Sequence, residues 1–105
     1  MWFIFPQIEG LGKSETARYF GIRSLAEAQA YLEHPVLGPR LAECARLVNE
    51  VEGRSIEAIL GEIDEMKFRS SMTLFEATAG KEGVFGECLR KYFGGERDPM
   101  TLARL

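Results

Sequence analysis

The residues best suited to chemistry fall in one segment, where Lys67, Ser70 and Ser71 follow Asp64 in a predicted helix over residues 64–79. At about 100° per residue the lysine and both serines share one face, with the aspartate at its edge. An ammonium group and two hydroxyls donate hydrogen bonds, so the pattern predicts a polar pocket for an anionic ligand. The alternative is an internal network, in which Lys67 pairs with a carboxylate and the hydroxyls bond to carbonyls one turn earlier.

The rest of this helix indicates which side meets water. Glu65, Arg69 and Glu76 fall together on the wheel and predict a solvated face. The opposite face, which carries Lys67 and the serines, is then the buried one.

His34 and Arg40 are the other candidates for such a site. Arginine and lysine suit phosphate or carboxylate recognition, and a histidine side chain can exchange protons near neutral pH. Because His34 stands before Pro35, a capping or turn role is the alternative. Both residues must converge with Lys67 on one concave surface for a site to exist.

Few residues of this chain are suited to metal binding or to thiol chemistry. The chain has one histidine, and its two cysteines, Cys44 and Cys88, lie far apart in sequence, so no zinc ligand set is expected and no cofactor is implied. Both cysteines fall in amphipathic patterns, which favours small, reduced core side chains over a disulfide or a nucleophile. Reduced thiols and the lack of a signal-peptide pattern predict a cytoplasmic protein of bacterial type.

The chain has 105 residues, of which 46% are hydrophobic and 28% charged, a balance typical of one globular domain spanning residues 1–105. The net charge is −3, so no basic field favours nucleic acid as a partner. No apolar run approaches the roughly 18 residues that a membrane span needs. We therefore expect neither nucleic acid nor a membrane as the partner.

The elements that must position these residues are short helices. Ser24 and Glu27 form a capping box ahead of a helix over 25–33. The predicted helices cover residues 14–20, 25–33, 38–52, 56–60, 64–79, 84–93 and a last turn from Pro99, with Asp64 as an N-cap. The fold class predicted is all-α, an irregular bundle of five or six short helices with an extended N-terminal arm.

That arm carries Trp2, Phe3 and Phe5 at the very start of the chain. Each large apolar side chain gains about 1.5–3 kcal/mol by leaving water. The three aromatic residues are therefore candidates for an interface.

Several motifs together resemble the bacterial family called domain of unknown function 1810, which is mainly helical and sometimes mislabelled calpastatin. They are Trp2 to Gln7, Gly10 to Gly12, Tyr31 to Leu41, Lys67 with Ser70 to Phe75, and Tyr92 to Gly95. The resemblance implies a helical fold of uncharacterised function and no established catalytic residues. The family's polar motif positions, here Gln7, His34, Arg40, Asp64, Lys67, Ser70 and Ser71, are its candidate ligand-binding residues.

Relatives in this family usually carry a helical segment before the Trp2 motif, and this chain starts at that motif. We therefore expect exposed apolar surface that a second copy covers, most simply in a dimer. The first functional hypothesis is a non-enzymatic binding or protein-interaction module that self-associates. The alternative is a small enzyme or ligand-binding domain for an anionic metabolite, such as a nucleotide derivative.

Overall fold

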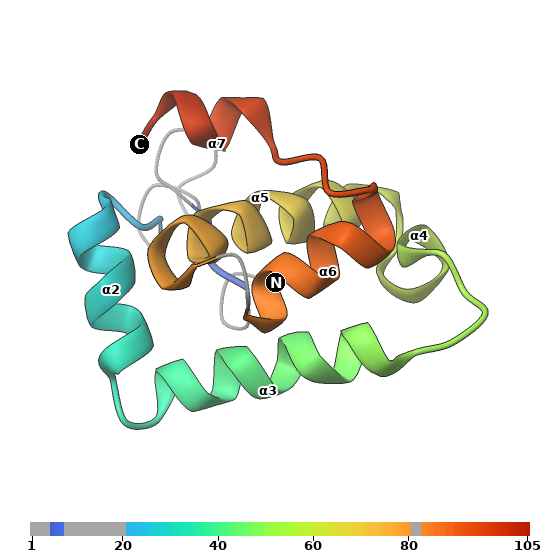
Figure 1. Cartoon of the computed structure of the whole chain (residues 1–105), viewed down its shortest axis with the longest axis horizontal. Helices are drawn as coiled ribbons and strands as arrows, with labels where there is room; N and C mark the ends of the chain where they lie inside the picture. The colour runs from blue at the N-terminus through green and yellow to red at the C-terminus, as the bar shows by residue number, and fades with distance from the viewer. Residues whose placement is uncertain (1–4, 8–20, 81–82) are drawn as a thin grey trace.

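The computed structural model describes residues 5–7, 21–80 and 83–105. Its helices are α2 (Leu25–Glu33), α3 (Leu37–Glu50), α4 (Ile56–Leu60), α5 (Glu62–Ala79), α6 (Val84–Phe93) and α7 (Pro99–Ala103) (Figure 1). Within these residues no strand is present, and the extended segment at Gln7 is tied by one backbone bond of 2.7 Å from Ile22. The predicted all-α bundle is confirmed. The helix expected over residues 14–20 lies outside the described residues.

Short polar side chains set the starts of three helices. The Ser24 hydroxyl accepts from the Glu27 amide at 3.1 Å, the Ser55 hydroxyl accepts from the Ala58 amide at 3.1 Å, and the Asp98 carboxylate accepts from the Thr101 amide at 3.2 Å. These bonds satisfy amides that the first turn of a helix leaves unpaired.

One predicted cap is wrong. Helix α5 begins at Glu62, and its N-cap is Gly61, which has a φ of 92°. Asp64 therefore lies inside the first turn, because the glycine adopts a backbone conformation that lets the helix start two residues earlier.

The turn between α2 and α3 is tight. A Cβ atom added to Gly38 would lie 1.9 Å from the carbonyl oxygen of Leu32, so the two helices approach each other too closely for any side chain there. Pro35, just after α2, disfavours helical geometry in the residue before it. The two residue types together explain why the chain reverses between Glu33 and Leu37.

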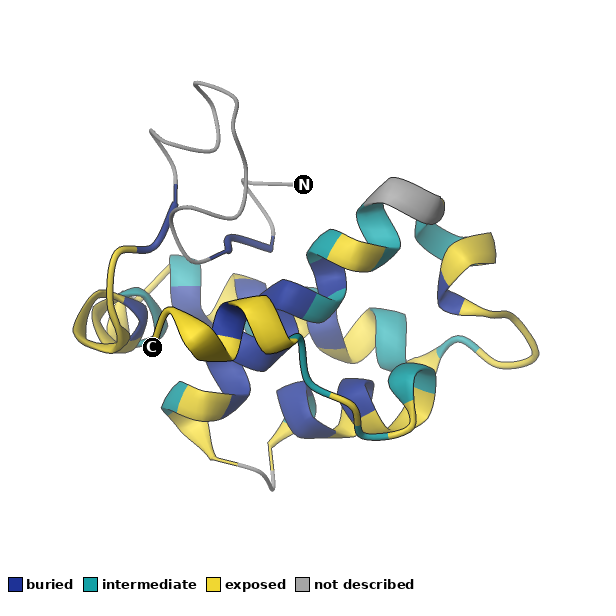
Figure 2. Ribbon diagram, turned by 90° about the horizontal axis from the view of Figure 1, so that it is seen from above, coloured by how far each residue is buried: buried dark blue, intermediate teal, exposed yellow. Residues whose placement is uncertain are grey.

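The core is built around α5, which runs through the middle of the molecule (Figures 1 and 2). Phe68 and Phe75 of this helix are fully buried. The Phe68 ring lies 4.9 Å from that of Phe5, edge to face, and the Phe75 ring lies 5.6 Å from Tyr31 and 5.7 Å from Phe85. Aromatic contacts thus join the start of the described chain, α2 and α6 to one central helix.

The predicted solvated face of α5 is wrong at Glu76, which is buried, whereas Glu65 and Arg69 are half-buried. Glu76 is 4% exposed, and the Arg69 side chain is 30% exposed. Both lie under the segment that leads into α7. A helical wheel places residues around one helix but does not show which neighbouring segment covers them.

Candidate functional site

The clearest polar cluster joins α5 to the start of α7, with Asp98 at its centre. The Ser70 hydroxyl donates to Asp98 Oδ2 at 2.9 Å and the Thr101 hydroxyl donates to the same oxygen, while the Asp98 amide donates to Thr73 Oγ1 at 2.9 Å. Thr101 and Thr73 are both fully buried. The carboxylate is therefore shared between two groups of Thr101 in α7 and one side chain of α5, Ser70, while Thr73 of α5 holds the Asp98 backbone.

Two arginines hold the preceding loop against the same helix. Arg69 donates to the carbonyl oxygens of Glu96 at 3.1 Å and Arg97 at 2.9 Å. Arg97 in turn forms a two-bond ion pair with the buried Glu76 carboxylate, one bond being 3.0 Å long. Bidentate pairs of this kind fix orientation as well as charge.

Ser70 therefore has a structural role, because its hydroxyl bonds to Asp98. Its single proton also lies within reach of the Met66 carbonyl oxygen at 3.1 Å, so the two acceptors share it, and the hydroxyls of Thr73 and Thr78 donate to the carbonyls of Arg69 and Leu74. The internal-network interpretation of the α5 polar face accounts for this serine.

Ser71 differs from its neighbour. Its hydroxyl is fully buried and has no hydrogen-bond partner among the described residues. Lys67, one turn earlier, is half-buried and makes no ion pair with any described carboxylate, Asp64 included. The pairing of Lys67 with a carboxylate is therefore not found in the part of the chain that the structure describes.

His34 has a clear structural role in the α2–α3 turn. Its Nδ1 atom accepts hydrogen bonds from the amides of Val36 and Leu37, each 3.1 Å long. These amides open α3, so the side chain acts as a cap there. The predicted capping role is confirmed.

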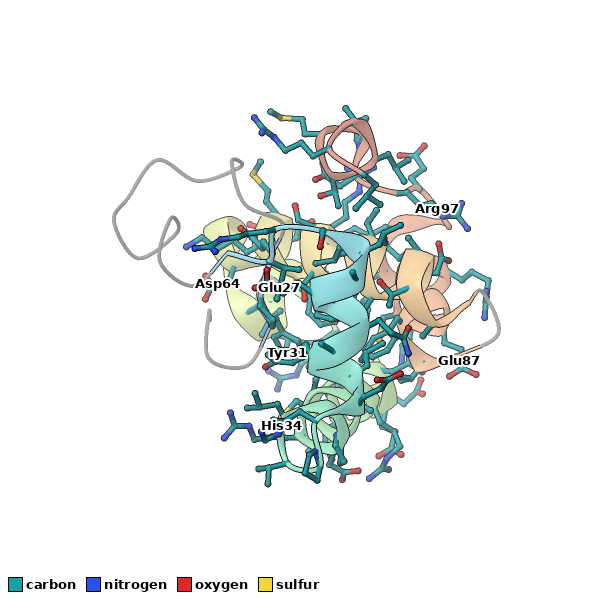
Figure 3. All side chains as sticks on the ribbon, turned by 90° about the vertical axis from the view of Figure 1, so that its left-hand side faces the viewer. Glu27, Tyr31, His34, Asp64, Glu87 and Arg97 are labelled. Atoms are coloured by element: carbon teal, nitrogen blue, oxygen red, sulfur yellow. The ribbon has the colours of Figure 1, made fainter. Side chains whose placement is uncertain are left out.

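Arg40 lies in the first turns of α3 and interacts with the hydroxyl of Tyr31 on α2. Burial raises the pKa of the Tyr31 hydroxyl above its usual value, and the Arg40 guanidinium partly offsets that rise. Figure 3 shows His34 at the lower end of α2, below Tyr31, and Arg97 at the upper right, whereas Asp64 lies at the start of α5, which Figure 1 places at the other end of the molecule from α2. The candidates thus fall into separate groups around the bundle.

The described part of the N-terminal arm is buried in its own chain. Phe5 is 4% exposed and contacts Phe68, and Gln7 is 5% exposed. The apolar surface of Phe5 is covered within the chain and is not available to a partner. The other two interface candidates, Trp2 and Phe3, lie outside the described residues.

A shallow groove of about 560 Å³ runs between the end of α3 and α6. Asn49, Glu52, Glu87, Arg90 and Lys91 line it. Lys91 donates to the carbonyl oxygens of Asn49 and Val51, the latter at 2.7 Å, and so caps the end of α3. The groove has side chains of both charges, and its lysine is already committed to the fold.

The thiols are unpaired, as predicted. Cys88 is fully buried, and burial raises the pKa of its thiol to about 12. No group of three or more histidine, cysteine, aspartate or glutamate residues that could hold a metal ion occurs in the described ranges. A search of the same ranges for a helix long and apolar enough to cross a membrane also finds none.

Apolar side chains are exposed on α7. Within this helix Thr101 is buried, whereas Leu102 is 46% exposed and Leu105, just after it, is 41% exposed. The start of α2, where Leu25 is 41% exposed, lies beside the end of α7 in both views (Figures 1 and 2). We call these three leucines the α7 surface.

Sequence reasoning missed the roles of Asp98, Thr101, Arg97 and Glu76. Asp98 was identifiable as a helix start because Pro99 follows it. Its bond to Ser70 joins residues 28 positions apart, which no local pattern reveals.

These observations define an all-α protein in which polar side chains of the central helix hold the last helix in place. The chain belongs to the family described as protein of unknown function (DUF1810), whose model matches residues 1–105. It is also similar to the crystal structure of the conserved hypothetical protein Rv1873 from Mycobacterium tuberculosis. The two are 55% identical with a TM-score of 0.96, over 99% of this chain and 74% of that chain. A comparison with curated proteins found no match.

Proposed function

We propose that this protein is a non-enzymatic binding module that contacts other polypeptides through the α7 surface and that a second copy is its first partner. The observation that carries the proposal is the orientation of α7. Its inward side is the polar one, with Thr101 bonded to Asp98. Leu102 and Leu105 are left facing outward.

Orientation matters because a surface helix normally buries its apolar side. The polar network fixes α7 to α5 by Asp98 and the Arg97–Glu76 pair, so the helix cannot turn its leucines inward without breaking these bonds. Full burial of an exposed leucine gains about 1.5–3 kcal/mol, so burying the exposed part of each of these leucines against a partner gains roughly half as much. A net charge of −3 opposes self-association only weakly.

Sedimentation equilibrium at micromolar to high micromolar concentration tests this proposal. We expect a monomer–dimer equilibrium that Leu102→Glu shifts to monomer, because a charge would be buried in the interface. The matched control is Leu47→Glu, since Leu47 is 52% exposed on α3, on the far side of the molecule from α7 (Figure 1). A wild-type protein that stays monomeric at high micromolar concentration would contradict self-association.

A second candidate function rests on Ser71 and Lys67. A buried hydroxyl without a described partner and a half-buried lysine one turn away are a pair of donors on one face of α5. Such donors suit an anionic metabolite. Calorimetric titration with inorganic phosphate and ATP tests this function. Binding should be lost in Lys67→Met and kept in Lys91→Met, and a wild-type chain that binds neither compound contradicts it.

We place the protein in the cytoplasm as part of the same proposal. Support comes from the two unpaired thiols of Cys44 and Cys88, since reducing compartments keep cysteines in that form. Fractionation of cells that express the chain would test the placement.

A further inference from the structure

We infer that residues 96–105 form a detachable strap that two copies of this chain exchange, so that the strap of each copy lies on α5 of the other. The exchanged contact is the polar one beneath α7. It does not involve the leucines of the α7 surface, so the exchange goes beyond the proposed function. An exchanged element joins two copies by contacts that each copy already makes within itself.

The strap contributes almost nothing to the hydrophobic core. None of the described core residues lies in it. Thr101 is its one buried residue, and the Thr101 hydroxyl bonds to Asp98 within the strap. On α5, the residues that bond to the strap are also polar, namely Ser70, Thr73 and Glu76. A strap that leaves this place uncovers hydroxyls and a carboxylate, which water can solvate.

One helix holds the strap. From Arg69 to Glu76, about two turns of α5, four side chains bond to it. Arg69 donates to two strap carbonyl oxygens and Ser70 donates to the strap carboxylate. Thr73 accepts from a strap amide, and Glu76 pairs with the Arg97 guanidinium. A second copy carries the same groups at the same spacing, so its strap complements this surface in charge and in hydrogen bonding.

A pair of glycines joins the strap to α6. Gly94 ends that helix with a φ of 61°, and Gly95 follows with a φ of 82°. Glycine adopts these angles and extended ones about equally readily. The pair can therefore change from the present turn to an extended connection while α6 stays intact. Such a connection lets the strap leave its own α5 and reach that of a second copy.

Charge reversal at the Arg97–Glu76 pair tests the exchange. Glu76→Arg alone or Arg97→Glu alone sets like charges opposite each other within one copy. When the two variants are mixed, exchange restores both pairs of opposite charge, and no contact within one copy does so. Native mass spectrometry resolves the mixed dimer, because the two substitutions change the mass in opposite directions. We expect the mixed dimer to exceed either homodimer at least about tenfold.

The matched control is a chain that carries both Glu76→Arg and Arg97→Glu. This chain restores the pair within itself. Mixed with the wild type, it should form fewer mixed dimers than homodimers, because exchange then sets like charges opposite each other. Circular dichroism checks that each variant folds.

A disulfide between copies decides the matter if Glu76→Arg does not fold. Ser70 is 8% exposed and bonds to Asp98 of the strap. Copies with Ser70→Cys mixed with copies with Asp98→Cys should therefore give a covalent dimer on oxidation. Glu50→Cys, at an exposed position of α3, replaces Ser70→Cys as the control for chance collisions. The wild-type chain gives the background from its own two cysteines.

Two results would overturn the exchange. One is a mixed dimer of the charge variants that does not exceed the homodimers, and the other is an equal yield of covalent dimer from Ser70→Cys and Glu50→Cys. The proposed function is tested apart from it, since Leu102→Glu removes a dimer formed through the α7 surface and leaves an exchanged strap in place. Loss of the wild-type dimer in Leu102→Glu, without a mixed dimer of the charge variants, would support the proposed function and contradict the exchange.

Discussion

Ser70 and Asp98 join the central helix to the last one, with the serine hydroxyl donating to the carboxylate at 2.9 Å. Ser71, the next residue, is more deeply buried than Ser70, and its hydroxyl has no partner among the described residues. Of two adjacent serines in one helix, one hydroxyl is therefore hydrogen-bonded and the other has no described partner. This contrast gives a direct test of the network.

Alanine at the two serines should have opposite effects on stability. Ser70→Ala removes a satisfied hydrogen bond and should lower the free energy of unfolding by about 1 kcal/mol, whereas Ser71→Ala removes an unsatisfied buried group and should leave it unchanged or raise it by up to about 1 kcal/mol. Both changes alter helix propensity equally. Urea unfolding measures the difference, and equal effects would show that Ser70 is not part of a stabilising network.

Asp98→Ala should cost about 2–3 kcal/mol of unfolding free energy, because it removes a helix cap and leaves the hydroxyls of Ser70 and Thr101 without their acceptor. Asp64→Ala is the control, since Asp64 caps no helix, and it should change the value by no more than about 0.5 kcal/mol. The two variants are compared by urea unfolding. If Asp64→Ala lost stability and Asp98→Ala did not, then Asp64, and not Asp98, would be the residue that caps a helix.

Glu76→Gln should lower the urea midpoint clearly, whereas Glu43→Gln should leave it nearly unchanged. Both glutamates pair with an arginine, but the Glu76 side chain is 5% exposed and that of Glu43 is 52% exposed. A solvated ion pair contributes little to stability, whereas the buried Glu76 carboxylate makes two charge-assisted hydrogen bonds to Arg97 that the neutral amide of glutamine weakens. Similar urea midpoints for the two variants would contradict the burial of Glu76 on α5.

His34→Ala should reduce stability by about 1 kcal/mol, the usual effect of losing a helix cap. The Nδ1 acceptor of two amides is lost, and a methyl group cannot replace it. Glu33→Ala, which removes an exposed acceptor of Gln29, is the neighbouring control and should have little effect. Thermal unfolding of the two variants gives the comparison, and equal melting temperatures would contradict the cap.

Stability should fall in alkaline solution because of Cys88. Burial raises the pKa of its thiol from 9.0 to about 12 in the folded protein, so between these values the unfolded chain releases a proton that the native chain keeps. The contribution is therefore complete below about pH 9 and is lost as the pH rises toward 12. Burial also raises the pKa values of Tyr31 and Tyr92, so these two hydroxyls lower the stability of the folded protein further as the pH rises.

Urea midpoints measured from pH 7 to about 10.5 check this dependence. In Cys88→Ala the urea midpoint should fall less steeply with pH than in the wild type. The fall that remains is the part due to the tyrosines. A pH dependence identical to that of the wild type would show that the thiol is not shielded as its burial requires.

Much of the local structure was predictable from the sequence because its signals act within a few residues. The helix over 25–33 has the predicted bounds, as do those over 56–60 and 84–93. Serine caps, Pro35 and Gly94 act on the backbone next to them, so their effect does not depend on the rest of the fold. The capping role of His34 follows from its place before Pro35 in the same way.

The candidate site was less predictable, because its residues are defined by distant partners. Asp64, predicted to cap α5, lies inside it, and Glu76, predicted to face water, is buried under Arg97. A wheel drawn for α5 alone gives Ser70 and Ser71 similar environments. Only the position of α7 makes one of them a donor to Asp98 and leaves the other without a described partner.

The sequence by itself therefore determined the helical class, the family and the bounds of several helices, since apolar periodicity and capping residues specify these locally. Tertiary structure decided which polar residues of α5 are structural, where Phe5 is buried and which leucines remain exposed on α7. The physical reason is that burial and hydrogen-bond partners depend on segments far apart in sequence, such as Ser70 and Asp98, which are 28 residues apart. These segments meet only when the chain packs.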